Sequence, residues 1–461
     1  METGFQLSEP SKTDARANPG SNDPSLNNEI QEKGNLQFSL AKIIGPGFIT
    51  GASDDDPSGI ATYSQAGAQF GLGLLWMALI QYPLMTVIQE MCARIGIVTG
   101  NGLAATIKQK YSSRVVFPLA GLLLAANTIN IGADIGAMAA AVRLLFPQVP
   151  FMAACAGFAA LVILLIIAIP YKRYVSILKY LAISLFAYVI TAIIVGGKVD
   201  EIIISSLIPH IELSPDFAMM FVAIFGTTIS PYLFFWQTSQ EAEELVQKGK
   251  EKEINSPQKP MPSKKDVKLM RADVMVGMAF SQLIMWSIII TTSGSLHSHG
   301  ITDVASAEEA AIALEPLVTS FPSSGIIAKS IFAAGIIGTG LLAIPVLAGS
   351  SGYALADTFG WKQGLDKKFK KAKAFYLVIA AATAIGLVIN LMGIDPIQAL
   401  IYSAVINGIV AIPILFCLMR IANDRQVMGI KTNGRISNLV GWLTLVVMTV
   451  AVGILFLLWG K

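Results

Sequence analysis

The chain has 461 residues, of which 54% are hydrophobic and only 14% are charged. Soluble domains carry about 25% charged residues, so this composition excludes an ordinary soluble protein. The formal net charge of +3 gives no support for nucleic-acid binding. Apolar runs of roughly 20 residues recur along the chain, which is the length that crosses a bilayer as a helix. We therefore expect an all-α membrane protein embedded in a lipid bilayer.

The chain divides into a short tail and one long membrane domain. Residues 1–38 are rich in Ser, Asn, Pro, Glu and Lys and lack an apolar pattern, which predicts a disordered cytoplasmic tail. Residues 39–461 are predicted to form a single transmembrane domain. Its eleven predicted spans are 41–66, 73–93, 115–141, 150–170, 174–196, 217–244, 271–293, 325–352, 373–393, 397–420 and 437–459.

The charges of the loops predict how these spans are oriented. With the N-terminus inside, only Arg143, Lys198, Lys329 and Lys461 of the 33 Lys and Arg residues fall on the outer side. Cytoplasmic loops carry the excess of Lys and Arg in membrane proteins. We therefore predict a multi-pass protein of the plasma membrane or bacterial inner membrane. Its N-terminus would be cytoplasmic and its C-terminus outside.

The first span carries three carboxylates at its middle. Residues 43–66 read IIGPGFITGASDDDPSGIATYSQA. A charge at the bilayer centre costs on the order of 2.5–3.5 kcal/mol even on lenient scales, so these aspartates need a compensating role. Pro57 removes a backbone donor and predicts a break in the helix. Broken helices at mid-depth hold the ions in many transporters, so the segment points to cation transport and no enzymatic activity is expected.

The sixth span is interrupted in the same way. Gly226, Thr227, Thr228, Ser230 and Pro231 lie in its middle. Spans one and six are five apart, which predicts two inverted repeats, at about 41–196 and 217–420, with an extra helix at 437–459. Backbone carbonyls freed near each proline would then be available to a cation. In span three, Asn130 and Asp134 share one helical face.

The sequence from 45 to 76, GPGFITGASDDDPSGIATYSQAGAQFGLGLLW, resembles the first span of the NRAMP divalent-metal transporters. The likeness continues at Gln89, at 94–100, from Gly226 to Tyr232, at 395–403 and at 441–443. It implies a LeuT-type fold of two inverted five-helix repeats with broken helices one and six. It also implies transport of divalent metal ions, with no cofactor beyond the transported ion.

The departures from the family pattern lie at its metal-binding positions. Asp56 keeps the family's aspartate ligand, whereas Gly59 replaces the asparagine and Ser230 replaces the methionine of span six. Other replacements are Ser58 for glycine, Thr227 for alanine, Tyr232 for histidine, Asn130 and Ala133 for the acidic pair of span three, and Ala404 for a glutamine. This set resembles the NRAMP-related magnesium transporters, a bacterial branch of the same fold.

The chemistry of these replacements agrees with that branch. Loss of a thioether removes the soft ligand that favours transition metals over hard ions. Mg²⁺ prefers oxygen ligands and sheds its water reluctantly, so a partly hydrated ion would suit the smaller side chains. We predict metal binding by Asp56, Ser58, Gly59, Thr227 and Ser230, with Asp55 as a weaker candidate. We expect uncoupled Mg²⁺ uptake by alternating access, with Mn²⁺ as a second candidate ion.

Three other functions stay open at this stage. The first is a proton-coupled Mn²⁺/Fe²⁺ importer of the usual NRAMP kind, which the missing methionine disfavours. The second is a metal-sensing membrane domain without transport, although the tail of about 38 residues resembles no folded soluble extension. The third is an amino-acid transporter of the same architecture, whose anionic substrate would prefer bare helix N-termini over Asp56.

Overall fold

The computed structural model describes residues 45–169, 184–195, 197–249, 255, 262–304, 306–320 and 323–458, and these residues contain helices and no strands. The predicted tail, 1–38, lies outside them. The long helices are α4 (Pro57–Phe70), α5 (Trp76–Thr99), α7 (Ser113–Leu145), α8 (Phe151–Ala168), α10 (Phe186–Val195), α12 (Pro215–Thr228), α13 (Pro231–Gln247), α14 (Lys264–Ser295), α17 (Ser324–Phe359), α18 (Lys373–Ile389), α19 (Pro396–Ala422) and α21 (Arg435–Leu458). Shorter helices are α3 (Pro46–Asp54), α6 (Leu103–Lys110), α11 (Val199–Leu207), α15 (Ala307–Ile312), α16 (Glu315–Val318) and α20 (Arg425–Met428).

Two of the predicted spans are broken where the prolines predicted. Helix α3 ends at Asp54 and α4 begins at Pro57, with Asp56 as its N-cap. Helix α12 ends at Thr228 and α13 begins at Pro231. Proline is tolerated at the first position of a helix because an N–H at that position would have no intrahelical acceptor. Each break therefore separates two half-helices and leaves backbone groups free near the proline.

Eight helical segments of the described chain are long and apolar enough to cross a membrane. They match the predicted spans at 115–141, 150–170, 217–244, 271–293, 325–352, 373–393, 397–420 and 437–459. The span at 41–66 is divided into two short half-helices, and α5 carries the polar side chains Gln81, Gln89, Glu90 and Arg94. The span at 174–196 lies partly outside the described residues. The count of eleven therefore stays a prediction.

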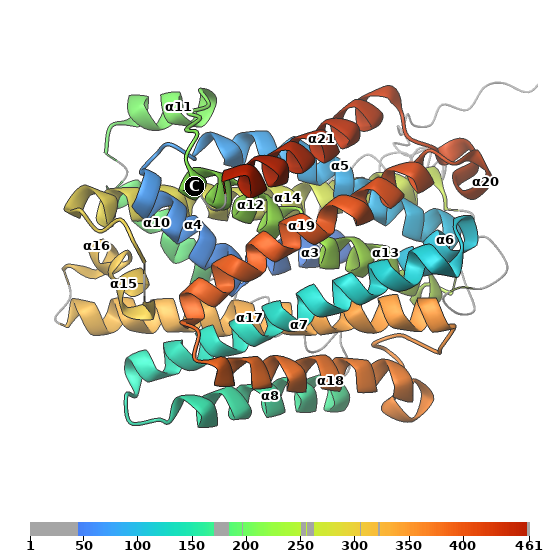
Figure 1. Cartoon of the computed structure of the whole chain (residues 1–461), viewed down its shortest axis with the longest axis horizontal. Helices are drawn as coiled ribbons and strands as arrows, with labels where there is room; N and C mark the ends of the chain where they lie inside the picture. The colour runs from blue at the N-terminus through green and yellow to red at the C-terminus, as the bar shows by residue number, and fades with distance from the viewer. Residues whose placement is uncertain are drawn as a thin grey trace, which may run out of the picture. The chain divides into compact units, whose positions relative to one another are not determined.

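The two half-helix pairs lie inside a shell of longer helices. In Figure 1, α3, α4, α12 and α13 lie between α5 and α14 on one side and α7 and α17 on the other. Helices α8 and α18 form an outer layer beyond α7 and α17, and α19 and α21 cross in front. Helix α19 contacts both α4 and α12, and it also contacts α7. The breaks are therefore surrounded by protein.

The first half-helix is fixed against α14. A Cβ atom placed on Gly51 would lie 2.1 Å from the carbonyl oxygen of Gly277, so the two backbones touch. The Asp273 carboxylate accepts hydrogen bonds from the amides of Gly45 (2.9 Å), Gly47 (2.7 Å) and Phe48 (3.0 Å). These amides belong to the first turn of α3, where no intrahelical acceptor exists. Asp273 therefore caps α3 from a neighbouring helix.

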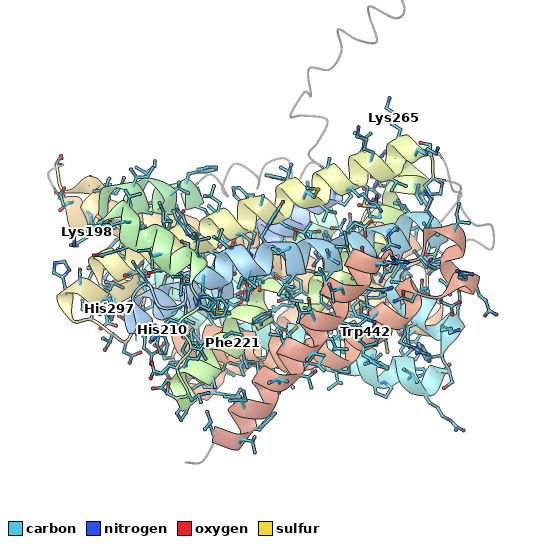
Figure 2. The ribbon with its side chains drawn as sticks, turned by 90° about the horizontal axis from the view of Figure 1, so that it is seen from above. Lys198, His210, Phe221, Lys265, His297 and Trp442 are labelled. Carbon is cyan, nitrogen blue, oxygen red and sulfur yellow. The ribbon has the colours of Figure 1, made fainter. Side chains whose placement is uncertain are left out.

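The two ends of the bundle carry different loops. In Figure 2, Lys198 and His297 lie at one end, and Lys265 lies at the other. The predicted topology assigns Lys198 and His297 to outer loops and Lys265 to an inner one. The segregation of these loops to opposite ends is what the predicted alternation of spans requires.

Candidate functional site

The two helix breaks meet at Gly59 and Thr227. A Cβ atom on Gly59 would lie 3.2 Å from the Thr227 hydroxyl oxygen and 3.2 Å from the carbonyl oxygen of Asp54. Glycine at position 59 therefore allows α4 to approach both the end of α3 and the end of α12. Helices α3 and α12 end here, so the negative ends of their dipoles face this point. Helices α4 and α13 begin at the same breaks with their positive ends, so the dipoles alone do not select a cation and the Asp56 carboxylate is the group that favours one.

Among the carboxylates beside the two breaks, that of Asp56 accepts the most hydrogen bonds. Its Oδ1 accepts hydrogen bonds from the amide of Gly59 (2.8 Å) and the hydroxyl of Ser58 (2.5 Å). Its Oδ2 accepts one from the side-chain amide of Asn130 on α7, at 3.0 Å. The side chain is 1% exposed. The sequence places Asp56 at the break, and the structure adds the polar groups that hold its carboxylate in one orientation.

A chain of amides links Asp56 to two further helices. The side-chain amide of Asn130 also donates to Asp134 on α7, at 3.2 Å. The Asn130 side-chain oxygen accepts from Asn407 on α19, at 3.0 Å. Amide groups hydrogen-bond without carrying charge, so they join the two carboxylates without neutralising either one. Asp134 thus belongs to the same polar network as Asp56.

Ser230 and Tyr232 bond to backbone at the breaks. The Ser230 hydroxyl donates to the carbonyl oxygens of Gly226 (2.5 Å) and Thr227 (2.8 Å). The hydroxyl of Tyr232 donates to the carbonyl of Ser53 at 3.0 Å, which joins α13 to α3. These contacts use some of the carbonyls that the breaks leave free. A cation bound here would compete for them, because buried carbonyl oxygens are also ligands for hard ions.

The other two aspartates turn toward α14. Ser281 on α14 donates to Asp54 at 2.5 Å, and its hydroxyl lies 3.5 Å from an oxygen of Asp55. Both aspartates are fully buried. The partner of Asp54 at Ser281 was not predicted, because a lone serine in an apolar span gives no sequence signal. Asp55 lies beside the break, whereas Asp56 faces Asn130.

Several buried oxygens around the breaks have no hydrogen-bond partner among the described residues. They include Asp54 Oδ1, Asp55 Oδ2, the Thr227 hydroxyl and Asp134 Oδ1. An unpaired buried polar group costs about 1–3 kcal/mol, so such a group needs a partner. An ion with its own water molecules would supply one. The described residues contain no cluster of three or more His, Cys, Asp or Glu side chains that could hold a metal ion on their own.

The six residues predicted to bind metal therefore have different surroundings. Five of them are buried side chains, namely Asp55, Asp56, Ser58, Thr227 and Ser230, and Gly59 is buried with them. Hydrogen bonds join Ser58 and Gly59 to Asp56, and Gly59 lies beside Thr227. Ser230 bonds to the Thr227 carbonyl. Their side chains offer oxygen and no sulfur or nitrogen, which matches the donors that Mg²⁺ prefers.

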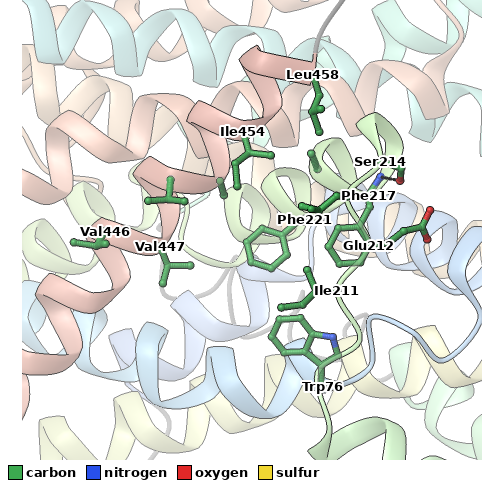
Figure 3. A pocket seen from close by; sticks show the side chains of 14 residues that line it. Trp76, Ile211, Glu212, Ser214, Phe217, Phe221, Val446, Val447, Ile454 and Leu458 are labelled. Atoms are coloured by element: carbon green, nitrogen blue, oxygen red, sulfur yellow. Dashed lines mark hydrogen bonds between the residues drawn. The ribbon is translucent and has the colours of Figure 1, made fainter. Parts of the chain in front are cut away.

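Two of the cavities that lie away from the breaks differ in their lining. One of about 280 Å³ includes Gln65 of α4, Asp216 and Asp303 in its lining, and the two carboxylates are exposed. The exposed carboxylates of Asp216 and Asp303 would raise the local concentration of cations at this cavity. The other, of about 400 Å³, lies between α12 and α21 and is lined mainly by apolar side chains such as Phe217, Phe221 and Ile454 (Figure 3). Its apolar lining cannot replace the hydration shell of an ion.

The all-α fold with its two broken helices defines a helical membrane protein. Solved structures of transporters share this fold over most of the chain. A manganese transporter from Eremococcus coleocola, in complex with an aromatic bis-isothiourea substituted compound, has a TM-score of 0.68 at 18% identity and covers 90% of this chain and 87% of its own. The nucleobase-cation-symport-1 family transporter Mhp1, with bromovinylhydantoin bound, has a TM-score of 0.55 at 13% identity and covers 89% and 92%.

The family model described as "Natural resistance-associated macrophage protein-like", Nramp, matches residues 47–458. The chain therefore belongs to the Nramp family. A curated relative, the divalent metal cation transporter MntH of Ralstonia nicotianae, is 26% identical over 429 residues. The alignment covers 90% of this chain and 90% of the relative. The protein is thus a divalent metal cation transporter and not an enzyme.

The geometry around Asp56 predicts separate roles for two asparagines of α7. Asn127 donates to the carbonyl of Leu347 (3.0 Å) and to the hydroxyls of Ser350 and Ser351, whereas Asn130 donates to Asp56. We expect Asn130→Ala to lower the initial rate of metal uptake about tenfold, as loss of an outer-shell partner typically does. Asn127→Ala should lower thermal stability in detergent and leave uptake per folded molecule within about twofold.

These two variants are matched because they remove the same side chain from neighbouring turns of one helix. Uptake in proteoliposomes, normalised to folded protein, measures the first effect, and thermal unfolding measures the second. Equal losses of uptake in both variants would mean that Asn130 acts only through helix packing.

Proposed function

We propose that this transporter carries Mg²⁺ as a partly hydrated ion, with Asp56 as its anionic ligand and Mn²⁺ as a second candidate substrate. The observation that carries the proposal is the donor set at the breaks. Asp56 is accompanied by hydroxyls and backbone carbonyls, and none of the six candidate residues supplies sulfur. Hard oxygen donors suit Mg²⁺, whereas Mn²⁺ and Fe²⁺ selectivity is supported by softer ligands.

The hydration of the ion follows from the number of protein donors. Mg²⁺ needs six oxygens in near-octahedral geometry and usually keeps several waters. Asp56 already accepts three hydrogen bonds, from Ser58, Gly59 and Asn130. A bound ion would therefore contact few protein atoms directly. Polar groups around the breaks, such as the Thr227 hydroxyl, would then bind the water molecules of the ion.

The alternative is a proton-coupled manganese or iron importer. It is favoured by the similar solved structure, which is a manganese transporter, whereas the curated relative is named only as a divalent metal cation transporter. The replacement of the family's methionine by Ser230 argues against it, because the soft ligand is lost. The two functions differ in their ion preference and in whether protons move with the metal.

Asp56 should be indispensable for uptake of either ion. Asp56→Ala removes the one carboxylate that faces the Gly59 amide and Asn130, so we expect Mg²⁺ uptake to fall at least a hundredfold, to the level of empty liposomes. The control is Asp200→Ala, which removes an exposed carboxylate from α11 and should leave uptake unchanged. Substantial uptake by a well-folded Asp56→Ala protein would contradict the assignment of Asp56 as the ligand.

Selectivity should respond to the side chain at position 230. We expect Ser230→Met with Gly59→Asn to shift the ratio of Mg²⁺ to Mn²⁺ uptake toward Mn²⁺ by about tenfold, because the pair restores a soft ligand. The space is tight at Gly59, where a Cβ would lie 3.2 Å from two oxygens and 3.3 Å from Tyr63. Ser230→Met alone is therefore measured in parallel. An unchanged ratio in both folded variants would show that selectivity is set elsewhere.

Transport should be uncoupled from protons. The positions aligned with the family's proton-transfer groups hold Asn130, Ala133 and Tyr232, and none of these side chains titrates near neutral pH. Each Mg²⁺ would then carry two charges inward, driven by its gradient and by the membrane potential. We expect a pH-sensitive dye inside liposomes to report no acidification during Mg²⁺ uptake with the potential clamped.

Asp134 is the group that tests this expectation. It is buried and shares the side-chain amide of Asn130 with Asp56. Acidification that follows the Mg²⁺ dose and disappears in Asp134→Asn would make Asp134 a proton carrier and favour the coupled alternative. If acidification is absent, Asp134→Asn should leave the pH trace unchanged.

A further inference from the structure

A polar cavity lies at the end of the bundle that the loop charges predict to be cytoplasmic. It has a volume of about 540 Å³, which is within the roughly 300–1,000 Å³ range of small-molecule sites. Its lining comes from the ends of α6 and α19 and from the beginnings of α20 and α21. Its lining residues are Lys110, Met419, Arg420, Asn423, Asp424, Arg425, Asn438 and Trp442. This cavity takes no part in binding the metal at the helix breaks.

The charges of this cavity do not cancel. Lys110 forms an ion pair with Asp424, and the hydrogen bond from its ammonium group lowers the pKa of the Asp424 carboxylate. Asp424 therefore stays ionised and compensates Lys110. Arg420 and Arg425 are exposed and form no ion pair with any carboxylate of the described residues. Two guanidinium groups thus remain for an anion, and guanidinium binds phosphate oxygens in a bidentate manner.

The cavity opens beside the surface that faces lipid. Trp442 is 36% exposed and packs edge-to-face against Phe416, which is 47% exposed, with their ring centroids 6.1 Å apart. Tryptophan is enriched at the level of lipid headgroups. In Figure 2, Trp442 lies toward the end of the bundle that holds Lys265. Apolar side chains of α21, including Leu439 and Leu443, are exposed next to it.

Hydrogen bonds fix the connection between α19 and α21, which borders the cavity. Arg94 of α5 donates to the carbonyl of Lys431 and to the side chain of Asn433 (2.6 Å), and it pairs with Glu90. The amide of Asn433 donates to the carbonyl of Ala422 at 3.0 Å, and its side chain donates to Asn438 at 3.1 Å. The connection from α19 to α21 is therefore fixed, and a fixed frame lowers the cost of ordering a ligand.

We propose that this cavity binds the phosphate headgroup of an anionic phospholipid from the adjacent leaflet. Arg420 and Arg425 bind the phosphate, Asn423 and Asn438 offer hydrogen bonds to the glycerol part, and the acyl chains lie along α21 beside Trp442. Basic pockets between membrane helices on the cytoplasmic side are suited to anionic headgroups. The occupant is a lipid because the charged lining is continuous with an exposed aromatic and apolar surface.

Native mass spectrometry of the delipidated protein in mild detergent tests the proposal, with phosphatidylglycerol titrated against phosphatidylcholine. The pocket variant is Arg420→Ala with Arg425→Ala. The control variant is Lys370→Ala with Arg435→Ala, which removes two exposed cations outside the cavity lining. We expect the pocket variant to bind phosphatidylglycerol roughly twenty-five-fold more weakly, because each of the two cations near an anionic headgroup contributes about fivefold. The control should bind as the parent does.

Three results would overturn the proposal. Equal weakening in both variants would mean diffuse attraction to the basic end, and unchanged binding in the pocket variant would remove the site. Displacement of phosphatidylglycerol by soluble glycerol phosphate at equal concentration would make a free phosphate the ligand. Quenching of Trp442 fluorescence by brominated phosphatidylglycerol, measured against Trp442→Phe, provides an independent readout. The quenching should be lost in the pocket variant and kept in the control variant.

Discussion

The arrangement of the site depends on the cost of burying the Asp56 carboxylate. A charge inside a membrane domain must be met by fixed dipoles or by an ion. The chain supplies the dipoles by ending α3 before the aspartate and starting α4 after it, so that the Gly59 amide, the Ser58 hydroxyl and Asn130 all donate to it. The second break brings the backbone carbonyls of Gly226 and Thr227 near the same point, where both accept from the Ser230 hydroxyl. The long helices around the breaks exclude lipid from this irregular backbone.

The sequence predicted the parts of the site that depend on local chemistry. Pro57 and Pro231 cannot continue a helix, and the observed helices begin at both residues. The contact of Asn130 with Asp134 follows from their spacing of one helical turn. The family was also recognised from these motifs, and the match over residues 47–458 confirms it. The preference for Mg²⁺ stays a prediction.

The contacts that the sequence did not predict join distant segments. Ser281 reaches Asp54 across 227 positions of the chain, and Asp273 reaches the amides of Gly45 and Gly47 across 228 and 226. A single sequence does not show which residue of a distant helix a buried serine or aspartate will contact. The sequence likewise did not indicate that Asn407 would donate a hydrogen bond to Asn130. Such pairs depend on the packing of whole helices, which hydrophobic periodicity does not specify.

The cap that Asp273 places on α3 has a consequence for the speed of the transport cycle. One carboxylate holds three amides of the first turn, and the neighbouring glycine backbones leave no space for sliding. Hydrogen bonds to a charged group contribute about 1.5–3 kcal/mol each, so a motion that separates α3 from α14 must break all three before new contacts form. Such a motion would therefore be slowed by the cap, and the cap would also favour the conformation in which α3 lies against α14. Residue 273 would thus influence the rate and the balance of conformations from outside the helix breaks.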